Sequence, residues 1–380
     1  MSKHVRTAIA TFLCTLLVIG LFAGCYFSSL FPVATPNFEE LVDFVVQAEE
    51  GREFRILQLT DTQIIDPGQS RYPERIGDTT PLTDENLYYD CFYYIEEAVK
   101  QAQPDLIIMT GDNVYGEFDD NGTSLQKLVA FMEYLEIPWA PVWGNHDNES
   151  TKGVTWQCQQ FDEAEHCLFK RGDTIGNSNY SIGVVQGNKL IKVLYMLDTN
   201  GCENGKSYSY MLSFGKYNQD EKIIAAATIG RNTMDWIDET SNNITAALGY
   251  TPSKFAAFHI PIDEFKMAVK SIGYSESDNF TISDPTGVNF GDKRDNIASI
   301  NAPGFWALMK GHNFDGIFVG HEHCNNFSIV YQGVRLTFGT KSSTYDKNER
   351  DMLGGTLITV AEGGATFTVE HCLVDELTEQ

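Results

Sequence analysis

A series of apolar runs, each ending at a polar cluster, constrains the fold of this chain more than any other feature. In order along the chain, they are LQLT-DTQ, LIIMT-GDN, APVW-GNHD, AAF-HIP and IFV-GHEH. The first polar cluster begins at Asp61 and the last ends at His323. Short apolar runs of this kind are typical of buried strands. In an open α/β sheet, ligand sites form outside the carboxyl ends of the strands. We therefore expect these clusters to converge on one site.

The rest of the chain alternates apolar runs with helical patterns, which indicates an α/β domain. We expect strands at 54–60, 105–110, 138–143, 190–197, 254–258 and 315–319, and helices at 84–101 and 124–136. Runs near 327–331, 334–338, 355–360 and 365–370, separated by glycines, predict antiparallel strands. Regions 150–185, 200–228 and 263–300 are polar and weakly periodic, so we expect loops or insertions around a site.

Length and charge narrow the class of protein. With 380 residues and 42% hydrophobic content, the chain has ample apolar material for a folded core. Its formal net charge of -25 repels phosphates over long range. No run of lysine or arginine offsets this charge, so binding to a nucleic-acid backbone is not expected.

The amino terminus predicts export. A basic start, MSKHVR, precedes an apolar segment from Ala8 to Ala23, and the segment ends in LFAGC, which resembles a lipoprotein cleavage site at Cys25. A cleaved signal, lipid attachment and a single membrane anchor all stay open. We assign 1–25 to a signal peptide or membrane anchor, 26–50 to a linker and 51–380 to one domain. This domain is expected to be secreted or membrane-anchored, facing outside the cytoplasm, and its oligomeric state is not predicted.

An oxidising compartment would permit disulfides among the cysteines. The nearest pairing along the chain joins Cys158 to Cys167. The sequence leaves the connectivity open.

The residue types in the five clusters indicate metal chemistry. Taken singly, Asp-x-Gln, GDN or a lone histidine is more often a turn, a cap or a core residue, whereas the ordered set indicates function. Together the clusters supply oxygen and imidazole donors, which suit a pair of Mn, Fe or Zn ions, divalent or of mixed valence. Two ions about 3.5 to 4 Å apart clamp a phosphate and activate a bound water, so no serine or cysteine nucleophile is required.

The ordered set of motifs resembles that of a known protein family. The ordered set D-x-[H/Q], GDN, GNHD, H and GHxH is similar to that of the calcineurin-like metallophosphoesterases. The sequence around these motifs, including PDLIIMTGDNVYG and IPWAPVWGNHDNES, resembles the single-domain branch of this family that is related to purple acid phosphatases. The resemblance covers roughly residues 53 to 345. The resemblance implies a four-layer α/β/β/α sandwich with mixed sheets.

The resemblance also implies a role for each matching residue. The first metal ion would be held by Asp61, Gln63, Asp112 and His323, with Asp112 bridging to the second, which Asn145, His259 and His321 would hold. His146 would protonate the leaving-group oxygen or stabilise charge on the phosphate, and Asp147 would orient it. A histidine beside a metal pair and paired to a carboxylate is a suitable general acid.

Gln63 is the point at which the chain departs from most of the family, which has histidine there. Tyr115 stands in the register of the tyrosine ligand of purple acid phosphatases, and both side chains cannot readily hold one coordination position. We favour Gln63 as the ligand and Tyr115 as a packed or substrate-side aromatic. A neutral amide oxygen should favour Mn or Fe over Zn. Alternation along an extended backbone turns Glu322 away from His321 and His323, so its role is expected to be structural.

These expectations combine into a metal-dependent phosphoesterase acting on a phosphate-ester substrate. Hydrolysis of monoesters is the first choice. A phosphodiesterase or pyrophosphatase acting on nucleotides or lipid headgroups is the alternative within the same chemistry. A catalytically weak, metal-bound surface binding protein is the alternative of another class.

Overall fold

The computed structural model describes residues 36–69, 83–117, 119–201, 227–284 and 286–376. The leader predicted at 1–25 lies outside these residues. The chain divides into two compact units, Met1–Asn37 and Phe38–Gln380, and the fold described below is that of the second unit. Among the described residues, no helix combines the length and the apolar character needed to cross a bilayer.

A five-stranded sheet has the order β14-β13-β2-β3-β4. Its strands are β2 (Phe54–Leu59), β3 (Leu106–Met109), β4 (Trp139–Pro141), β13 (Gly354–Val360) and β14 (Phe367–Leu373). The first three are parallel to one another, with Ile56 opposite Leu106 and Ile107 opposite Trp139. β13 pairs antiparallel with both β2 and β14, as the sequence of the tail predicted.

A nine-stranded sheet has the order β1-β5-β6-β7-β10-β12-β11-β9-β8. Its strands are β1 (Phe44–Ala48), β5 (Tyr180–Gln186), β6 (Lys189–Met196), β7 (Ser253–Ala257), β8 (Phe280–Ser283), β9 (Phe290–Lys293), β10 (Phe314–Val319), β11 (Ser328–Tyr331) and β12 (Val334–Phe338). Its centre, from β6 through β7 and β10 to β12, is parallel. The flanking pairs β5·β6, β11·β12 and β8·β9 are antiparallel, so both sheets are mixed.

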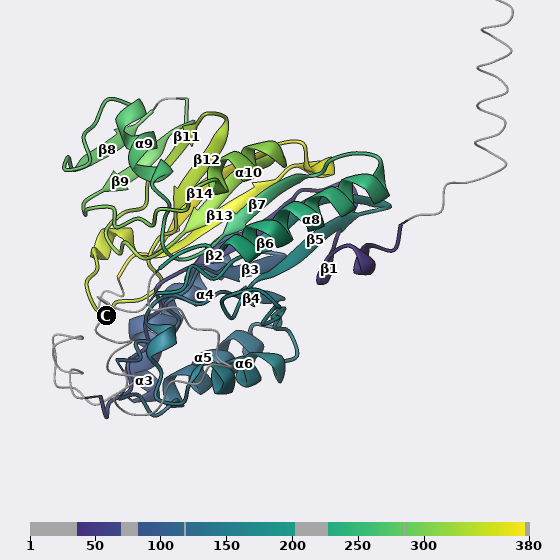
Figure 1. The fold of residues 1–380 in the computed structure, drawn as a ribbon. Coiled ribbons are helices and arrows are strands. Elements are labelled where there is room, and N and C mark those ends of the chain that lie inside the picture. Colours follow the sequence, from purple (N-terminus) through teal and green to yellow (C-terminus); the bar gives the residue numbers. More distant parts are fainter. Residues whose placement is uncertain (1–35, 70–82, 118, 202–226, 285, 377–380) are drawn as a thin grey trace, which may run out of the picture. The chain divides into compact units, whose positions relative to one another are not determined.

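Helices cover the outer faces of the two sheets (Figure 1). Beside the smaller sheet lie α3 (Asp84–Leu87), a π-helical turn (Tyr88–Phe92), α4 (Tyr93–Ala102), α5 (Thr123–Tyr134) and α6 (Val154–Asp162). Against the larger sheet lie α8 (Arg231–Leu248), α9 (Glu264–Ser271) and α10 (Phe305–Gly311). The four-layer α/β/β/α arrangement is therefore confirmed.

Two hydrophobic cores hold these layers together. One joins the smaller sheet to its helices and to the facing side of the larger sheet, and the other lies between the larger sheet and α8, α9 and α10. Alternation along β10 divides its side chains between them, because Phe318 belongs to the first core whereas Ile317 and Val319 belong to the second. Burial on both faces explains why the central strands read as continuous apolar runs.

The structure corrects several expectations about the connecting regions. The range 26–50, expected to be a linker, contains β1, which pairs in parallel with β5. Region 150–185 contains α6 and the start of β5, and region 263–300 contains α9, β8 and β9. Cys158 and Cys167 are free thiols, so the pairing suggested for them is wrong. These elements escaped detection because their partners lie far away along the chain or because their exposed faces are polar.

Candidate metal centre

The loops that follow the carboxyl ends of β2 and β3 in the smaller sheet, and of β7 and β10 in the larger sheet, lie close together. Backbone hydrogen bonds join these loops: the N–H of Asp61 donates to the carbonyl of Gly111 at 3.1 Å, and the N–H of Gln63 donates to that of Asp112 at 2.9 Å. In the larger sheet, the N–H of Gly320 donates to the carbonyl of His259 at 3.1 Å. The N–H of His321 donates to Oδ2 of Asp61 at 3.0 Å, so the loops of the two sheets form one continuous rim.

Two clusters of metal-binding side chains lie at this rim. Asp112, His259 and His321 form one, and Asp61, Asp112 and His323 form the other, with the ligand atoms of each cluster within 4.8 Å of one another. Asp112 belongs to both. The structure thus brings together five of the seven residues predicted as ligands, with Asp112 common to both clusters.

Hydrogen bonds from the far side of each ring orient two of the imidazoles. Nδ1 of His259 lies 2.8 Å from the carbonyl oxygen of Thr110, and Nδ1 of His323 lies 2.9 Å from that of Lys347. A carbonyl can only accept, so each Nδ1 carries a proton, and Nε2 is the ring atom left to face a metal ion. Nε2 of His259 lies 3.2 Å from Oδ2 of Asp112, inside the cluster.

Buried polar atoms test whether metal ions fit this site. Oδ1 of Asp61 and Oδ1 of Asn145 are buried and accept no hydrogen bond from the described residues. Buried oxygens without a partner are costly. Metal ions, one beside each oxygen, would satisfy these atoms, and the mixture of carboxylate, amide oxygen and imidazole donors suits Mn, Fe or Zn. The residues present therefore fit a metal centre.

Charged groups within the site change the pKa values of its carboxylates and imidazoles, in part against the effect of burial. Burial disfavours the ionised form of Asp61, but the imidazole of His323, whose Nε2 lies 3.5 Å from Oδ1, and other nearby cationic groups lower the pKa of Asp61 to about 2. Burial likewise opposes a charge on His259, but the facing carboxylate of Asp112 raises its pKa to about 9. For His321, burial and the charge of His259 lower the pKa to about 3. The carboxylates at the centre are thus ionised and ready to bind cations.

The backbone of the site is strained. Asp61, Gln63, Asp112 and His321 have φ of 52°, 41°, 50° and 78°, a region that non-glycine residues seldom adopt. Strained residues of this kind persist where the surrounding structure enforces them, and they concentrate at functional sites.

The motif glycines allow close approach of the loops. A Cβ on Gly144 would lie 2.1 Å from Oδ1 of Asp112, and one on Gly320 would lie 2.6 Å from Oδ2 of Asp61. Only glycine fits at either position.

His146 has a different orienting partner from the one expected. Its Nδ1 lies 2.8 Å from Oε2 of Glu149, which is 1% exposed. The carboxylate of Asp147 instead accepts from the N–H groups of Gly144 at 2.8 Å and Val114 at 3.0 Å. The expectation that Asp147 orients His146 is therefore corrected: Asp147 holds the loops together, and Glu149 holds the imidazole.

Tyr115 packs against the same imidazole. Its ring is buried and stacks on His146, with the ring centroids 3.9 Å apart and the planes at 23°. This geometry agrees with the packed aromatic expected from the sequence.

Glu322 belongs to neither cluster of ligand atoms and makes a structural contact instead. Its carboxylate accepts the N–H of Ala298 at 2.5 Å and so fastens a neighbouring loop.

Comparison with known proteins identifies the family. The sequence model described as calcineurin-like phosphoesterase matches residues 54–325, more than half of the chain. The chain belongs to the calcineurin-like phosphoesterase family. As a member of this family, it is a hydrolase that acts on phosphate ester bonds.

Curated relatives of this phosphoesterase carry contrasting names. A protein of Arabidopsis thaliana named "Probable inactive purple acid phosphatase 14" is 27% identical over 76% of this chain and 70% of its own length. "Phosphatase DCR2" of Saccharomyces cerevisiae is 26% identical over 74% of this chain and 46% of its own length. Among solved structures, a dimetal phosphatase from Danio rerio is 12% identical over 83% of this chain and 98% of its own, with a TM-score of 0.45.

Sequence reasoning missed two polar residues of this phosphoesterase. Glu149 lies three residues after His146 in a short 3₁₀ turn (Asp147–Glu149), and that spacing brings the two side chains to one side. Lys341 follows the apolar strand β12 in the text VRLTFGTKSS, which is the same strand-end pattern that revealed the other clusters. Both signals were available in the sequence.

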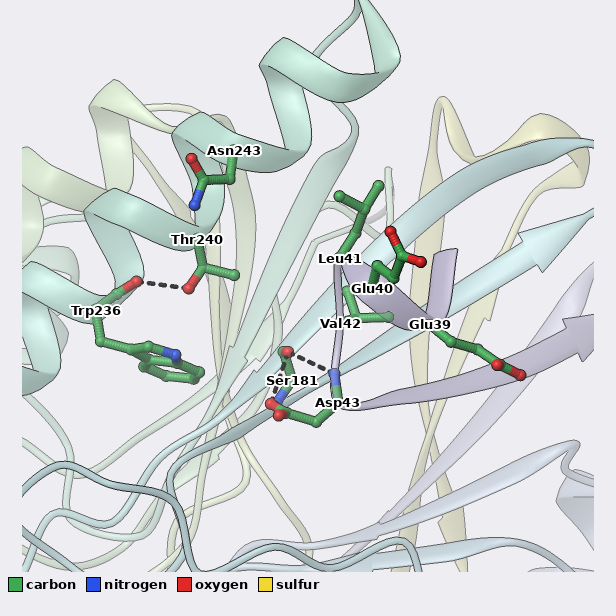
Figure 2. A pocket seen from close by; sticks show the side chains of 9 residues that line it. All are labelled: Glu39, Glu40, Leu41, Val42, Asp43, Ser181, Trp236, Thr240 and Asn243. Carbon is green, nitrogen blue, oxygen red and sulfur yellow. Dashed lines mark hydrogen bonds between the residues drawn. The ribbon is translucent and has the colours of Figure 1, made fainter. Parts of the chain in front are cut away.

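A hollow elsewhere on the phosphoesterase holds none of the predicted site residues. It measures about 260 Å³ and lies between the start of β1, β5 and α8 (Figure 2). Its lining includes Trp236 and the carboxylate of Asp43, which accepts from the N–H and the hydroxyl of Ser181 at 2.8 and 3.0 Å. Lys170 also forms a salt bridge with Asp43, at 2.6 Å.

Proposed function

We propose that this chain is a phosphomonoesterase that works with two metal ions. The supporting observation is that the carboxylate of Asp112 belongs to both clusters of ligand atoms. In the proposal, Asp61, Asp112 and His323 hold the first ion, and Asp112, Asn145, His259 and His321 hold the second. Bound Mn, Fe or Zn ions would supply Lewis acidity and activate the attacking water.

His146 is proposed as the general acid. Its backbone N–H donates to Oδ1 of Asp112 at 2.9 Å, which ties the histidine to the carboxylate shared by both ligand clusters. Because Nδ1 faces Glu149, Nε2 is the atom that would donate a proton to the leaving-group oxygen. Stacking on Tyr115 and the bond to Glu149 would hold the ring for that transfer.

The name of the Arabidopsis relative raises the alternative of a binding protein without turnover. An intact His146 with two supporting partners, together with a complete set of oxygen and imidazole donors, favours activity. Such strained and charged arrangements are costly, and a protein retains them chiefly where they serve function.

Elemental analysis and an ester panel test the proposal. Purified protein should contain two ions per chain and hydrolyse phenyl phosphate faster than diphenyl phosphate, and Asp112→Asn should lose both ions and turnover. Asp315→Asn is a control, because Asp315 pairs with Lys192 near the opposite end of β10. Zero or one ion would contradict the dinuclear centre, and faster hydrolysis of the diester would favour the phosphodiesterase. Absence of all hydrolysis, with partner binding unchanged in Asp112→Asn, would favour a binding protein.

We also propose that the domain acts outside the cytoplasm, secreted or held at a membrane by its leader. The support is the basic start followed by the apolar segment Ala8 to Ala23. Fractionation of expressing cells, with and without residues 1–25, tests this. Cytoplasmic protein in both cases would contradict it.

A further inference from the structure

Lys341 places a buried ammonium group beside the first cluster of ligand atoms. Lys341 lies just beyond β12, and it is 2% exposed. Its Nζ donates to the carbonyl of Asp61 at 2.8 Å and to Oε1 of Gln63 at 2.8 Å. Lys341 also lies beyond residues 54–325, to which the family model extends.

This contact fixes which end of the Gln63 amide faces the centre. An ammonium group can only donate, so the amide oxygen must be the atom that faces Lys341. The amide nitrogen then lies 3.1 Å from Oδ2 of Asp112 and donates to it. An amide NH₂ group has no lone pair to offer a metal ion. In this orientation Gln63 supports Asp112 instead of ligating.

We propose that Lys341 holds Gln63 out of the metal coordination, so that Asp61, Asp112 and His323 alone among the described residues bind the first ion. The inference rests on the dinuclear centre proposed above, and it replaces the expectation that Gln63 is a ligand. With fewer ligands and a nearby positive charge, the first ion should bind more weakly than the second. Lys341 and Gln63 thus make the two positions unequal.

Calorimetric titration with Mn²⁺ tests this on the metal-stripped, full-length chain. Wild type should show one tight and one weak phase, and His323→Ala should remove the weak phase. Gln63→Leu should change the weak-phase affinity by no more than about threefold, because no ligand is lost. Lys341→Met should tighten it about tenfold or more, by removing the charge and releasing the amide to turn its oxygen inward.

The double variant separates the two effects of Lys341. If the released amide oxygen contributes, Gln63→Leu should weaken the first ion in the Lys341→Met background although it does little alone. Lys254→Met is the matched control, because that buried lysine donates to two backbone carbonyls, those of Pro252 and His312, near the amino end of β7. Both phases should be unchanged in it.

Each outcome decides the inference. A loss of more than about threefold in Gln63→Leu that is confined to the weak phase would make Gln63 a ligand and overturn the inference, because loss of its hydrogen bond to Asp112 alone would act on both phases. Unchanged affinity in folded Lys341→Met would also overturn it. If Lys341→Met does not fold, the result for Gln63→Leu decides. If the protein binds no Mn²⁺ at all, the dinuclear centre is overturned together with this inference. If it binds in two phases whose affinities are the same in wild type, Gln63→Leu and Lys341→Met, this inference alone is overturned.

Discussion

The contact between Glu149 and His146 gives the sharpest test of how this phosphoesterase uses its proposed general acid. Glu149→Gln keeps the shape of the side chain and removes its charge. The hydrogen bond it alters is 2.8 Å long, and Glu149 is 1% exposed. Hydrogen bonds to charged groups contribute about 1.5–3 kcal/mol. If the whole free energy of this hydrogen bond stabilises the transition state, kcat should fall by about 10- to 150-fold.

The assay compares two monoesters that differ in leaving group. An alkyl phosphate needs a proton on its departing oxygen, whereas a dinitrophenyl phosphate does not. Glu149→Gln should therefore lower kcat for the alkyl ester by the full factor and for the aryl ester by much less, with KM little changed. Glu149→Asp should recover part of the loss.

A similar pair elsewhere in the chain is the control. His166 lies 3.2 Å from Glu133, remote from the ligand clusters, so Glu133→Gln should leave both rates unchanged. Equal loss for both esters in Glu149→Gln, or unchanged rates, would refute the positioning role. Metal content and thermal stability measured on the same samples exclude loss of the centre as the cause.

Three other predictions follow from single contacts. Gly144→Ala should displace Asp112 and reduce bound metal by elemental analysis, whereas Gly311→Ala, with no neighbour within 4 Å of the added Cβ, should retain it. Burial raises the pKa of Asp198 to about 6, so the folded state keeps a proton that the unfolded chain loses above about pH 4. The free energy of unfolding should therefore fall by about 3 kcal/mol between about pH 4 and pH 6. Urea unfolding of Asp198→Asn across this pH range should lack that decrease, and the same decrease in the variant would contradict the effect of burial. Tyr115→Phe should keep its metal and its activity, because phenylalanine preserves the ring that stacks on His146, and loss of an ion would instead make the phenol oxygen a ligand.

The sequence alone determined where the central strands of both sheets lie and which polar residues follow their carboxyl ends. A parallel strand buried on both faces must be an apolar run, and its chain must turn at the carboxyl end, so the pattern is local and readable. For this reason Asp61, Asp112, His259 and His323 could be assigned to one site before any contact was known.

Only the tertiary structure decided which side chains face which partners. β1 was taken for linker because its stability comes from pairing with β5, whose residues lie far away along the chain. The orientation of Gln63 depends on Lys341, which follows a strand of the other sheet. Hydrogen bonds between segments so distant in sequence depend on how the two sheets pack against each other. The residues next to Gln63 in the sequence do not determine that packing.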